Sequence, residues 1–382
     1  MFEYFVGPER PLSWTFQFWP VLLTSFIFGL LATWLCKKIA LRYGIVDRPD
    51  NTVKTHKKPI AYLGGIGILA GFGIGVLTGI GCFKENVGIS RWLMSVLTGS
   101  AIACFVGLID DVYNLKPWHK IAGQAIASIT LIAAGIMPVL NPFLEPFGLS
   151  MPYRVEWAVG VPIVILTVLG ATNSLNLLDG LDGLCAGVTI IITTALLFLA
   201  VHLATWDWSP VHDPVRMIVC LALVGGVCGF LPFNRAPAKI FMGDAGSMLL
   251  GFVAAAIMML FAKAFPRWWA ASIVVFGLPI LDTAVALVRR WLNKRPLFVS
   301  DRGHIYDQMI DRGIPLKKTV AICYALSATY AIIGVAMSQI RTRHAIIVYI
   351  IVFVISALVV WKMGFLKMEG LRGAVKKRNK PS

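Results

Sequence analysis

Charged residues are scarce in this chain, and acidic residues are the scarcest. Charged residues make up 14% of the 382 residues, with 19 Asp and Glu against 35 Lys and Arg, while 58% of the residues are hydrophobic and the mean hydropathy is +0.77. A soluble fold cannot hide that much apolar surface, so the composition excludes a soluble enzyme and indicates a polytopic membrane protein. The net charge of +16 does not indicate nucleic acid, because the basic residues lie in short loops between apolar runs and there meet lipid headgroups or phosphorylated substrates.

Cysteine pairs and metal-binding cysteine spacings are also lacking. The seven cysteines lie mostly within apolar segments, which excludes a disulfide scaffold and indicates reduced core residues. The apolar run from Trp14 to Leu35 shows no convincing small-residue cleavage site, so we interpret it as a retained first helix and not as a signal peptide.

Long apolar runs are abundant. If about 20 apolar residues make one crossing, the chain has about eleven candidate helices. We therefore predict an all-α polytopic membrane protein, with a single transmembrane domain at 1–363 and a basic cytoplasmic tail at 364–382. The candidate helices lie near 18–40, 60–83, 91–109, 119–138, 156–172, 184–204, 214–232, 245–263, 268–291, 317–339 and 342–362.

Most Lys and Arg residues lie at or after the ends of the odd-numbered helices. The positive-inside rule assigns that side to the cytoplasm. This predicts a multi-pass protein of the inner (plasma) membrane, with its N-terminus outside and its C-terminus in the cytoplasm. The Asp, Asn and His residues concentrate in loops on the same side, so an active site is expected at the cytoplasmic face. These loops are 110–118, 172–183, 233–245 and 292–316.

Two adjacent acids, Asp110 and Asp111, end the third candidate helix within LIDDVYNLKPWHK, and Lys120 follows. A carboxylate inside a membrane costs about 2.5–3.5 kcal/mol on insertion scales, so two adjacent carboxylates need water, a cation or a metal ion. The alternative is a helix end in the aqueous interface.

A second polar group occupies 172–187, TNSLNLLDGLDGLCAG, where Asn173, Asn176, Asp179 and Asp182 are three residues apart. On one continuous helix they would drift around the axis, but the glycines favour a turn at which the four side chains converge. Carboxylates and carboxamide oxygens suit a hard cation such as Mg²⁺. The alternative is that they are ordinary turn residues.

A third polar segment, FNRAPAKIFMGDAGS, contains Asp244, which follows Gly243 and precedes Gly246 at the start of the eighth candidate helix. We interpret Asp244 as a ligand of a metal ion that a phosphate shares, with a helix N-cap as the alternative. Phe241 nearby can stack on a planar base or simply pack.

Basic groups near two further loops suit phosphate. His304 and Arg302 lie in DRGHIYDQMIDRG, where arginine could make forked contacts with a diphosphate. A solvated loop is the alternative. Lys57 lies in KTHKKPIAYLGG, where binding of substrate competes with binding of lipid headgroups. Together the polar segments supply what phosphoryl transfer needs, namely cations that offset charge and a fixed geometry.

The chain resembles the polyprenyl-phosphate N-acetylhexosamine-1-phosphate transferases, because it has these motifs in the same order from about residue 45 to 315: KTHKKPIAYLGG, LIDDVYNLKPWHKIAGQ, NSLNLLDGLDGLCAG, FNRAPAKIFMGDAGS and a late histidine loop. These membrane enzymes start teichoic acid and O-antigen assembly, and the peptidoglycan MraY enzymes are related to them. The resemblance implies that undecaprenyl phosphate attacks a UDP-amino sugar to give the lipid diphospho-sugar and UMP, with Mg²⁺ or Mn²⁺ as cofactor.

The resemblance also implies roles for single residues. Asp110 and Asp111 would act in catalysis, Lys120 would position phosphate, and His304 begins the histidine motif. The residues implied to bind metal or substrate are Asn176 and Asp244 for the metal ion, Asp179 and Asp182 in the nucleotide-sugar pocket, and Asn234 and Phe241 on the uridine side.

The histidine motif departs from the family pattern, because Ile305, Tyr306 and Asp307 follow His304 where further histidines are common. This disfavours the MraY enzymes, which transfer phospho-N-acetylmuramoyl-pentapeptide. Our leading hypothesis is transfer of N-acetylglucosamine 1-phosphate. Two other functions stay open: transfer of a different amino sugar 1-phosphate, and a non-enzymatic transporter. Assembly of the chain into a homodimer also stays open.

Overall fold

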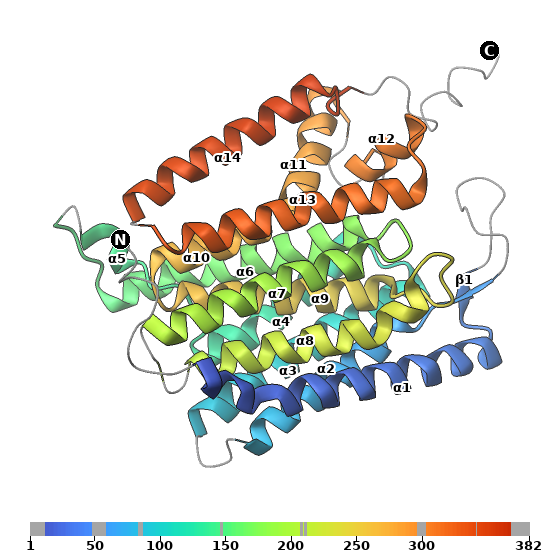
Figure 1. The fold of residues 1–382 in the computed structure, drawn as a ribbon, viewed down its shortest axis with the longest axis horizontal. Coiled ribbons are helices and arrows are strands. Elements are labelled where there is room, and N and C mark those ends of the chain that lie inside the picture. Colours follow the sequence, from blue (N-terminus) through green and yellow to red (C-terminus); the bar gives the residue numbers. More distant parts are fainter. Residues whose placement is uncertain are drawn as a thin grey trace.

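The long helices of the computed structural model run side by side, and one end of the bundle carries a two-stranded sheet. The structure describes residues 12–47, 59–82, 87–145, 148–206, 209, 212–295, 303–340 and 342–367. Figure 1 shows β1 and the α6–α7 and α8–α9 connections at the right of the view, at the same end of the bundle.

All eleven predicted runs form helices. The predicted run 268–291 is two helices, α10 and α11, that meet at a bend of 67°, and η1, α5 and α12 are short additional helices. In chain order the elements are η1 Leu12–Phe18, α1 Trp19–Tyr43, β1 Val46–Asp47, β2 Ile60–Ala61, α2 Gly64–Cys82, α3 Val87–Tyr113, α4 Pro117–Ala134, α5 Asn141–Leu144, α6 Tyr153–Leu178, α7 Leu184–Trp206, α8 His212–Asn234, α9 Gly243–Ala262, α10 Pro266–Val275, α11 Gly277–Leu292, α12 Ile305–Asp311, α13 Leu316–Met337 and α14 Thr342–Lys362.

The protein is an all-α, multi-pass membrane protein, as predicted. By length and composition, nine helices of the described residues can cross a membrane, or ten if the bent pair of α10 and α11 counts as one crossing. The eleventh predicted crossing is α4, which has 18 residues and is not among them. Its first turns carry His119, Lys120 and Gln124, which lower its apolar content.

Helix α9 forms the centre of the bundle, and its most apolar window is fully buried. Two glycines let neighbouring helices approach it closely. A Cβ added to Gly107 of α3 would lie 2.3 Å from the carbonyl oxygen of Asp244, and one added to Gly251 would lie 2.3 Å from Cα of Thr172 on α6. Real Cβ atoms do not reach such distances, so glycine is required where α3 and α6 meet α9. This packing brings the C-terminal ends of α3 and α6 to the N-terminal end of α9.

The loop that leads into α9 is tied to the start of α2. Strand β1 pairs antiparallel with β2, and Ala61 of β2 forms a parallel bridge with Ile240. The backbone N–H of Phe241 donates to the Ala61 carbonyl at 2.9 Å, and Gly64 N–H donates to the Phe241 carbonyl at 2.9 Å. The start of α9 is therefore held from two sides, by α2 and by the ends of α3 and α6.

Candidate active site

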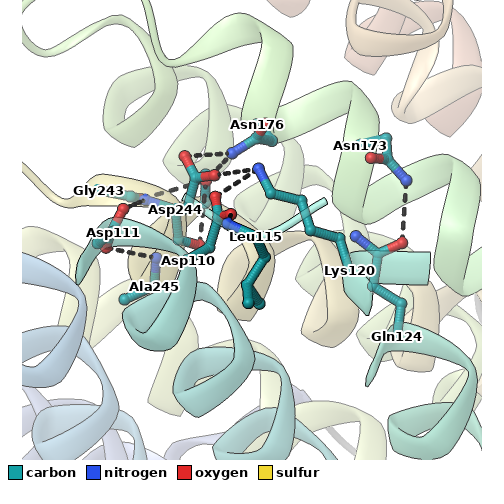
Figure 2. Close-up of polar contacts among 11 residues, drawn as sticks. Asp110, Asp111, Leu115, Lys120, Gln124, Asn173, Asn176, Gly243, Asp244 and Ala245 are labelled. Carbon is teal, nitrogen blue, oxygen red and sulfur yellow. Dashed lines mark hydrogen bonds and ion pairs between the residues drawn. The ribbon is translucent and has the colours of Figure 1, made fainter. Parts of the chain in front are cut away.

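A lysine bridges two carboxylates at the end of the bundle where α3 ends and α9 begins. Nζ of Lys120 lies 2.5 Å from Oδ2 of Asp110 and 2.6 Å from Oδ2 of Asp244 (Figure 2). Burial lowers the pKa of the Lys120 ammonium, but the charges of Asp244 and Asp110 outweigh burial and raise the pKa above its ordinary value. Lys120 is therefore a permanent cation between two acids from other helices.

The two adjacent acids at the end of α3 have different partners. Asp110 accepts a hydrogen bond from the backbone N–H of Leu115 at 2.8 Å, which closes the turn after α3. Asp111 accepts from the backbone N–H groups of Asp244 at 2.8 Å and Ala245 at 3.1 Å. A carboxylate on these free N–H groups satisfies the first turn of α9 and complements its dipole, so Asp111 fixes the helix that carries Asp244.

The N-cap alternative for Asp244 does not match this geometry. Helix α9 begins at Gly243, so its N-cap residue is Met242. The Met242 side chain makes no capping hydrogen bond. The capping carboxylate comes instead from Asp111, more than a hundred residues earlier in the chain. Gly243 has a φ of +68°, a conformation that glycine adopts without strain.

Asn176, at the end of α6, completes the cluster. Its Nδ2 donates to Oδ1 of Asp244 at 2.8 Å and to Oγ of Ser247 at 3.0 Å. Asn173, one turn earlier, points elsewhere and donates to Oε1 of Gln124 at 3.0 Å (Figure 2). The structure thus joins Asp110, Lys120, Asn176 and Asp244 by direct contacts, and Asn173 stands apart from them.

The donor set fits a hard divalent cation that shares its coordination with a phosphate. No group of three His, Cys, Asp or Glu residues within the described ranges could hold a metal ion by itself. Mg²⁺, however, typically takes one or two carboxylates together with substrate phosphates and water. Asp110 and Asp244 offer such carboxylates, the Asn176 amide offers an oxygen if it rotates, and the Lys120 ammonium already lies between the two acids.

The connection between α6 and α7 is held in place by hydrogen bonds between side chains and backbone groups. Oδ2 of Asp182 accepts from the N–H of Ala238 at 2.9 Å. The buried amide of Asn234 accepts from Gly183 N–H and donates to the Ile240 carbonyl, both at 3.0 Å. Asn234 therefore holds two loops together and has its oxygen and one N–H engaged, whereas our prediction placed it on the uridine side.

Asp179 lies in the same connection and is a weak acid in this environment. Burial, and then the negative charges of Asp244, Asp111 and Asp182, raise the pKa of Asp179 to about 8. A carboxyl that keeps its proton near neutral pH can donate a hydrogen bond as well as accept one. Phe241, predicted to stack on a base, lies with its ring edge-on to Tyr62 at 6.4 Å between centroids.

His304 precedes α12 and is buried. Its Nδ1 lies 2.8 Å from Oδ2 of Asp282, and its ring stacks on Tyr306 at 5.6 Å between centroids. Sequence reasoning missed Asp282, which is the single acidic residue in the apolar run 268–291. The available signal was the rule that a lone acid inside a membrane segment has a partner and a function.

Two predicted substrate-binding residues, Lys57 and Arg302, lie outside the described residues. The remaining predicted site residues all lie at one end of the bundle, on α3, α4, α6, α8, α9 and the connections between them, and before α12.

The chain is similar to a glycosyl transferase family and to several bacterial transferases. The model of glycosyl transferase family 4 matches residues 93–262. Over 357 residues the chain is 28% identical to a probable undecaprenyl-phosphate N-acetylglucosaminyl 1-phosphate transferase of Bacillus subtilis, covering 91% of each chain. It is 28% identical to a decaprenyl-phosphate N-acetylglucosaminephosphotransferase of Mycobacterium tuberculosis, over 79% of this chain and 78% of the relative. It is 27% identical to an undecaprenyl-phosphate alpha-N-acetylglucosaminyl 1-phosphate transferase of Yersinia pestis, over 82% of each.

Proposed function

We propose that the chain, which the model of glycosyl transferase family 4 matches over residues 93–262, transfers N-acetylglucosamine 1-phosphate from UDP-N-acetylglucosamine to undecaprenyl phosphate. UMP is released, and the lipid product begins the assembly of a cell-envelope glycan. The names of the relatives described above include undecaprenyl or decaprenyl phosphate and N-acetylglucosamine.

The reaction exchanges one phosphoanhydride bond for another. An oxygen of the lipid phosphate attacks the phosphorus that bears the sugar, and a new P–O bond forms. The bond from that phosphorus to the oxygen shared with the uridine phosphate breaks, and UMP leaves with the electron pair. A lipid phosphate dianion needs no proton transfer for this step, so the main demand on the site is to bring anions together.

One observation carries the proposal: Asp110, Lys120, Asn176 and Asp244 come from four different helices and touch one another at one end of the bundle. The Lys120 ammonium can pair with a phosphate oxygen. Asp111 holds the N-terminal turn of α9, so the geometry around Asp244 is fixed before substrate arrives. Fixed positions of charged groups are what an in-line phosphoryl transfer requires.

Magnesium is part of the proposal, with manganese as a substitute. Asp244 and Asn176 would hold the ion, and Asp110 lies within reach on the other side of Lys120. When bound, the ion would supply positive charge to the phosphates at the reacting centre.

We further propose that the site end of the bundle faces the cytoplasm, with the N-terminus outside, in the inner membrane. Basic residues gather at this end, on the last turns of α1 and α11, in the α8–α9 connection and at the start of α13, and the positive-inside rule assigns such an end to the cytoplasm. A site at helix ends also suits the substrates, since a lipid phosphate and a water-soluble nucleotide sugar meet at the membrane surface. A transporter would more commonly place its polar groups near the midplane.

The test is a reconstituted reaction. Purified protein in detergent is incubated with undecaprenyl phosphate, Mg²⁺ and a panel of UDP-sugars, and UMP and the lipid product are measured. We expect UMP with UDP-N-acetylglucosamine, its loss after chelation of the metal, and its return with added Mg²⁺ or Mn²⁺. The absence of UMP with every donor would refute the proposal.

Two controls sharpen the assay. UMP released only with the UDP-muramoyl-pentapeptide donor would establish the peptidoglycan reaction instead. Asp244→Asn keeps the shape of the side chain but removes the charge that faces Lys120, so we expect a folded protein without turnover. Wild-type activity in this variant would remove Asp244 from the site.

A further inference from the structure

The buried Asp282 carboxylate binds two donors at the start of α12. Oδ2 lies 2.8 Å from Nδ1 of His304, and Oδ1 accepts from the backbone N–H of Ile305 at 2.7 Å. Asp282 and His304 are 1% and 5% exposed, so neither contact is a surface pairing. One carboxylate thus fixes both the imidazole and the first turn of the helix that follows it.

This contact determines the tautomer of the imidazole. A carboxylate oxygen can only accept, so Nδ1 of His304 carries the proton that it donates to Asp282. In the neutral ring the other nitrogen, Nε2, is then an acceptor. Among the described residues, Nε2 has no hydrogen-bond partner. Nε2 is also absent from the set of polar atoms that are both fully buried and unpartnered, so it is not completely enclosed by the protein. Nε2 is therefore the edge of the ring that remains available to another molecule.

The face of the imidazole is fixed as well, and it is linked to the candidate site. The Tyr306 ring stacks on His304 with an interplanar angle of 11°, and its hydroxyl donates to the Leu177 carbonyl at 2.9 Å. Leu177 follows Asn176 directly in the chain. A Cβ added to Gly180 would lie 2.1 Å from the Tyr306 hydroxyl, so Tyr306 packs directly on the connection that carries Asp179.

We propose that Asp282 is a positioning residue for the transfer reaction: it holds His304 in the tautomer whose Nε2 accepts a hydrogen bond from a donor group of the substrates, a hydroxyl or an amide N–H. The inference rests on the proposed function, because a positioned His304 needs a reaction to serve. The arrangement of Asp282, His304 and Tyr306 extends the site from α9 across α6 to α11, a helix on which the sequence motifs mark no functional residue.

Asp282→Asn tests the proposal, because the structure dictates how the amide would bind. The backbone N–H of Ile305 can only donate, so the amide oxygen must face it and the amide NH₂ must face Nδ1 of His304. Nδ1 then becomes the acceptor, and the ring proton moves to Nε2. The substrate donor would then face an N–H in place of an acceptor. A polar group left without its hydrogen-bond partner typically costs a factor of about 10–100, so we expect kcat/KM to fall by about that factor.

A double-mutant cycle separates positioning from folding. In a His304→Gln background, Asp282→Asn should cost less than about twofold further, because the group that it positions is gone. Thr283→Val, at the next residue of α11, serves as the matched control. Oγ1 of Thr283 donates to Oγ of Ser174 at 2.9 Å and does not bond to His304, so this variant should keep the wild-type kcat/KM. Equal losses from Asp282→Asn in both backgrounds would overturn the proposal, and so would a wild-type kcat/KM in either single variant.

A measurement without substrate keeps this inference distinct from the proposed function. A histidine Nδ1–H bound to a buried carboxylate gives a strongly downfield proton resonance in ¹⁵N-histidine-labelled protein. We expect this resonance in the wild type and its loss in both Asp282→Asn and His304→Gln. If it is present while no UDP-sugar gives UMP, the proposed function fails but the pairing stands. If the wild type is active and lacks the resonance, the positioning role is refuted.

Discussion

Replacing Gly243 by alanine tests whether the α9 N-terminus and Asp111 form one unit. Gly243 has a φ of +68°, and a Cβ there would lie 2.5 Å from Oδ2 and 3.0 Å from Cγ of Asp111. The Asp111 carboxylate would have to leave its position and give up its hydrogen bonds to the backbone N–H groups of Asp244 and Ala245. Alanine therefore adds a clash to the backbone strain.

Gly135 provides the matched control. It ends α4 with a φ of +76°, and a Cβ there would meet nothing within 4 Å. Gly135→Ala thus brings only the cost of the left-handed conformation, about 1–2 kcal/mol. Gly243→Ala brings the same cost and the loss of at least one hydrogen bond to a charged group, about 1.5–3 kcal/mol more. The expected totals are about 1–2 and about 2.5–5 kcal/mol.

The assays are thermal unfolding in detergent and UMP release at saturating substrate. Gly243→Ala should unfold at the lower temperature and lose about 100-fold in turnover, since a displacement of about 1 Å at a reacting centre can have that effect. Gly135→Ala should keep wild-type turnover. If the two variants match in turnover and in unfolding temperature, the contact of Asp111 with α9 has no functional weight, and our account of the site is wrong.

Single contacts of three other residues give further predictions. Lys120→Met should abolish UMP release, because Asp110 and Asp244 lose the cation between them, while Lys116→Met at the exposed N-cap of the same helix should leave it unchanged. Asn234→Ala should destabilise the protein by about 1–3 kcal/mol, the cost of leaving a buried backbone group unpaired, whereas the exposed Asn293→Ala should change the free energy of unfolding little. The pKa of Asp179, about 8 in the folded protein, exceeds the ordinary value of about 4, so the folded state holds an extra proton between these values and stability falls as pH rises through that window. Asp179→Asn should show a smaller drop in unfolding temperature between pH 5 and pH 8, and an unchanged drop would contradict the raised pKa.

The fold was largely predictable because each long apolar run must satisfy its backbone within one helix. The bend between α10 and α11 was not predicted. Pro279 lies inside the predicted run 268–291, but the break falls three residues earlier, at Phe276. Proline in the first turn of a helix loses no intrahelical hydrogen bond, so Pro279 is compatible with the start of α11, and hydropathy alone gives no position for the bend.

The members of the site were more predictable than their individual roles. Asp110 and Asp111 are adjacent in sequence, but neighbouring residues on a helix point about 100° apart. One therefore faces Lys120 and the other the N-terminus of α9. Which acid takes which part depends on the rotation of α3 against α9, and that rotation is set by packing at Gly107. No local pattern in the sequence contains this information.

Charge explains why a divalent cation suits this end of the bundle. Asp110, Asp111 and Asp244 bring three negative charges if all are ionised, and Lys120 returns one positive charge. The site is then negative before any phosphate enters, although its proposed substrates are a phosphate monoester and a nucleotide diphosphate. Lysine alone cannot offset both, because a single ammonium already engages two carboxylates. A divalent ion placed between Asp244 and the phosphates would lower the repulsion on both sides, and it would release Lys120 from at least one acid. Under the proposed function, the contact of Lys120 with Asp110 and Asp244 would therefore give way, at least in part, when a metal ion and the anionic substrates bind.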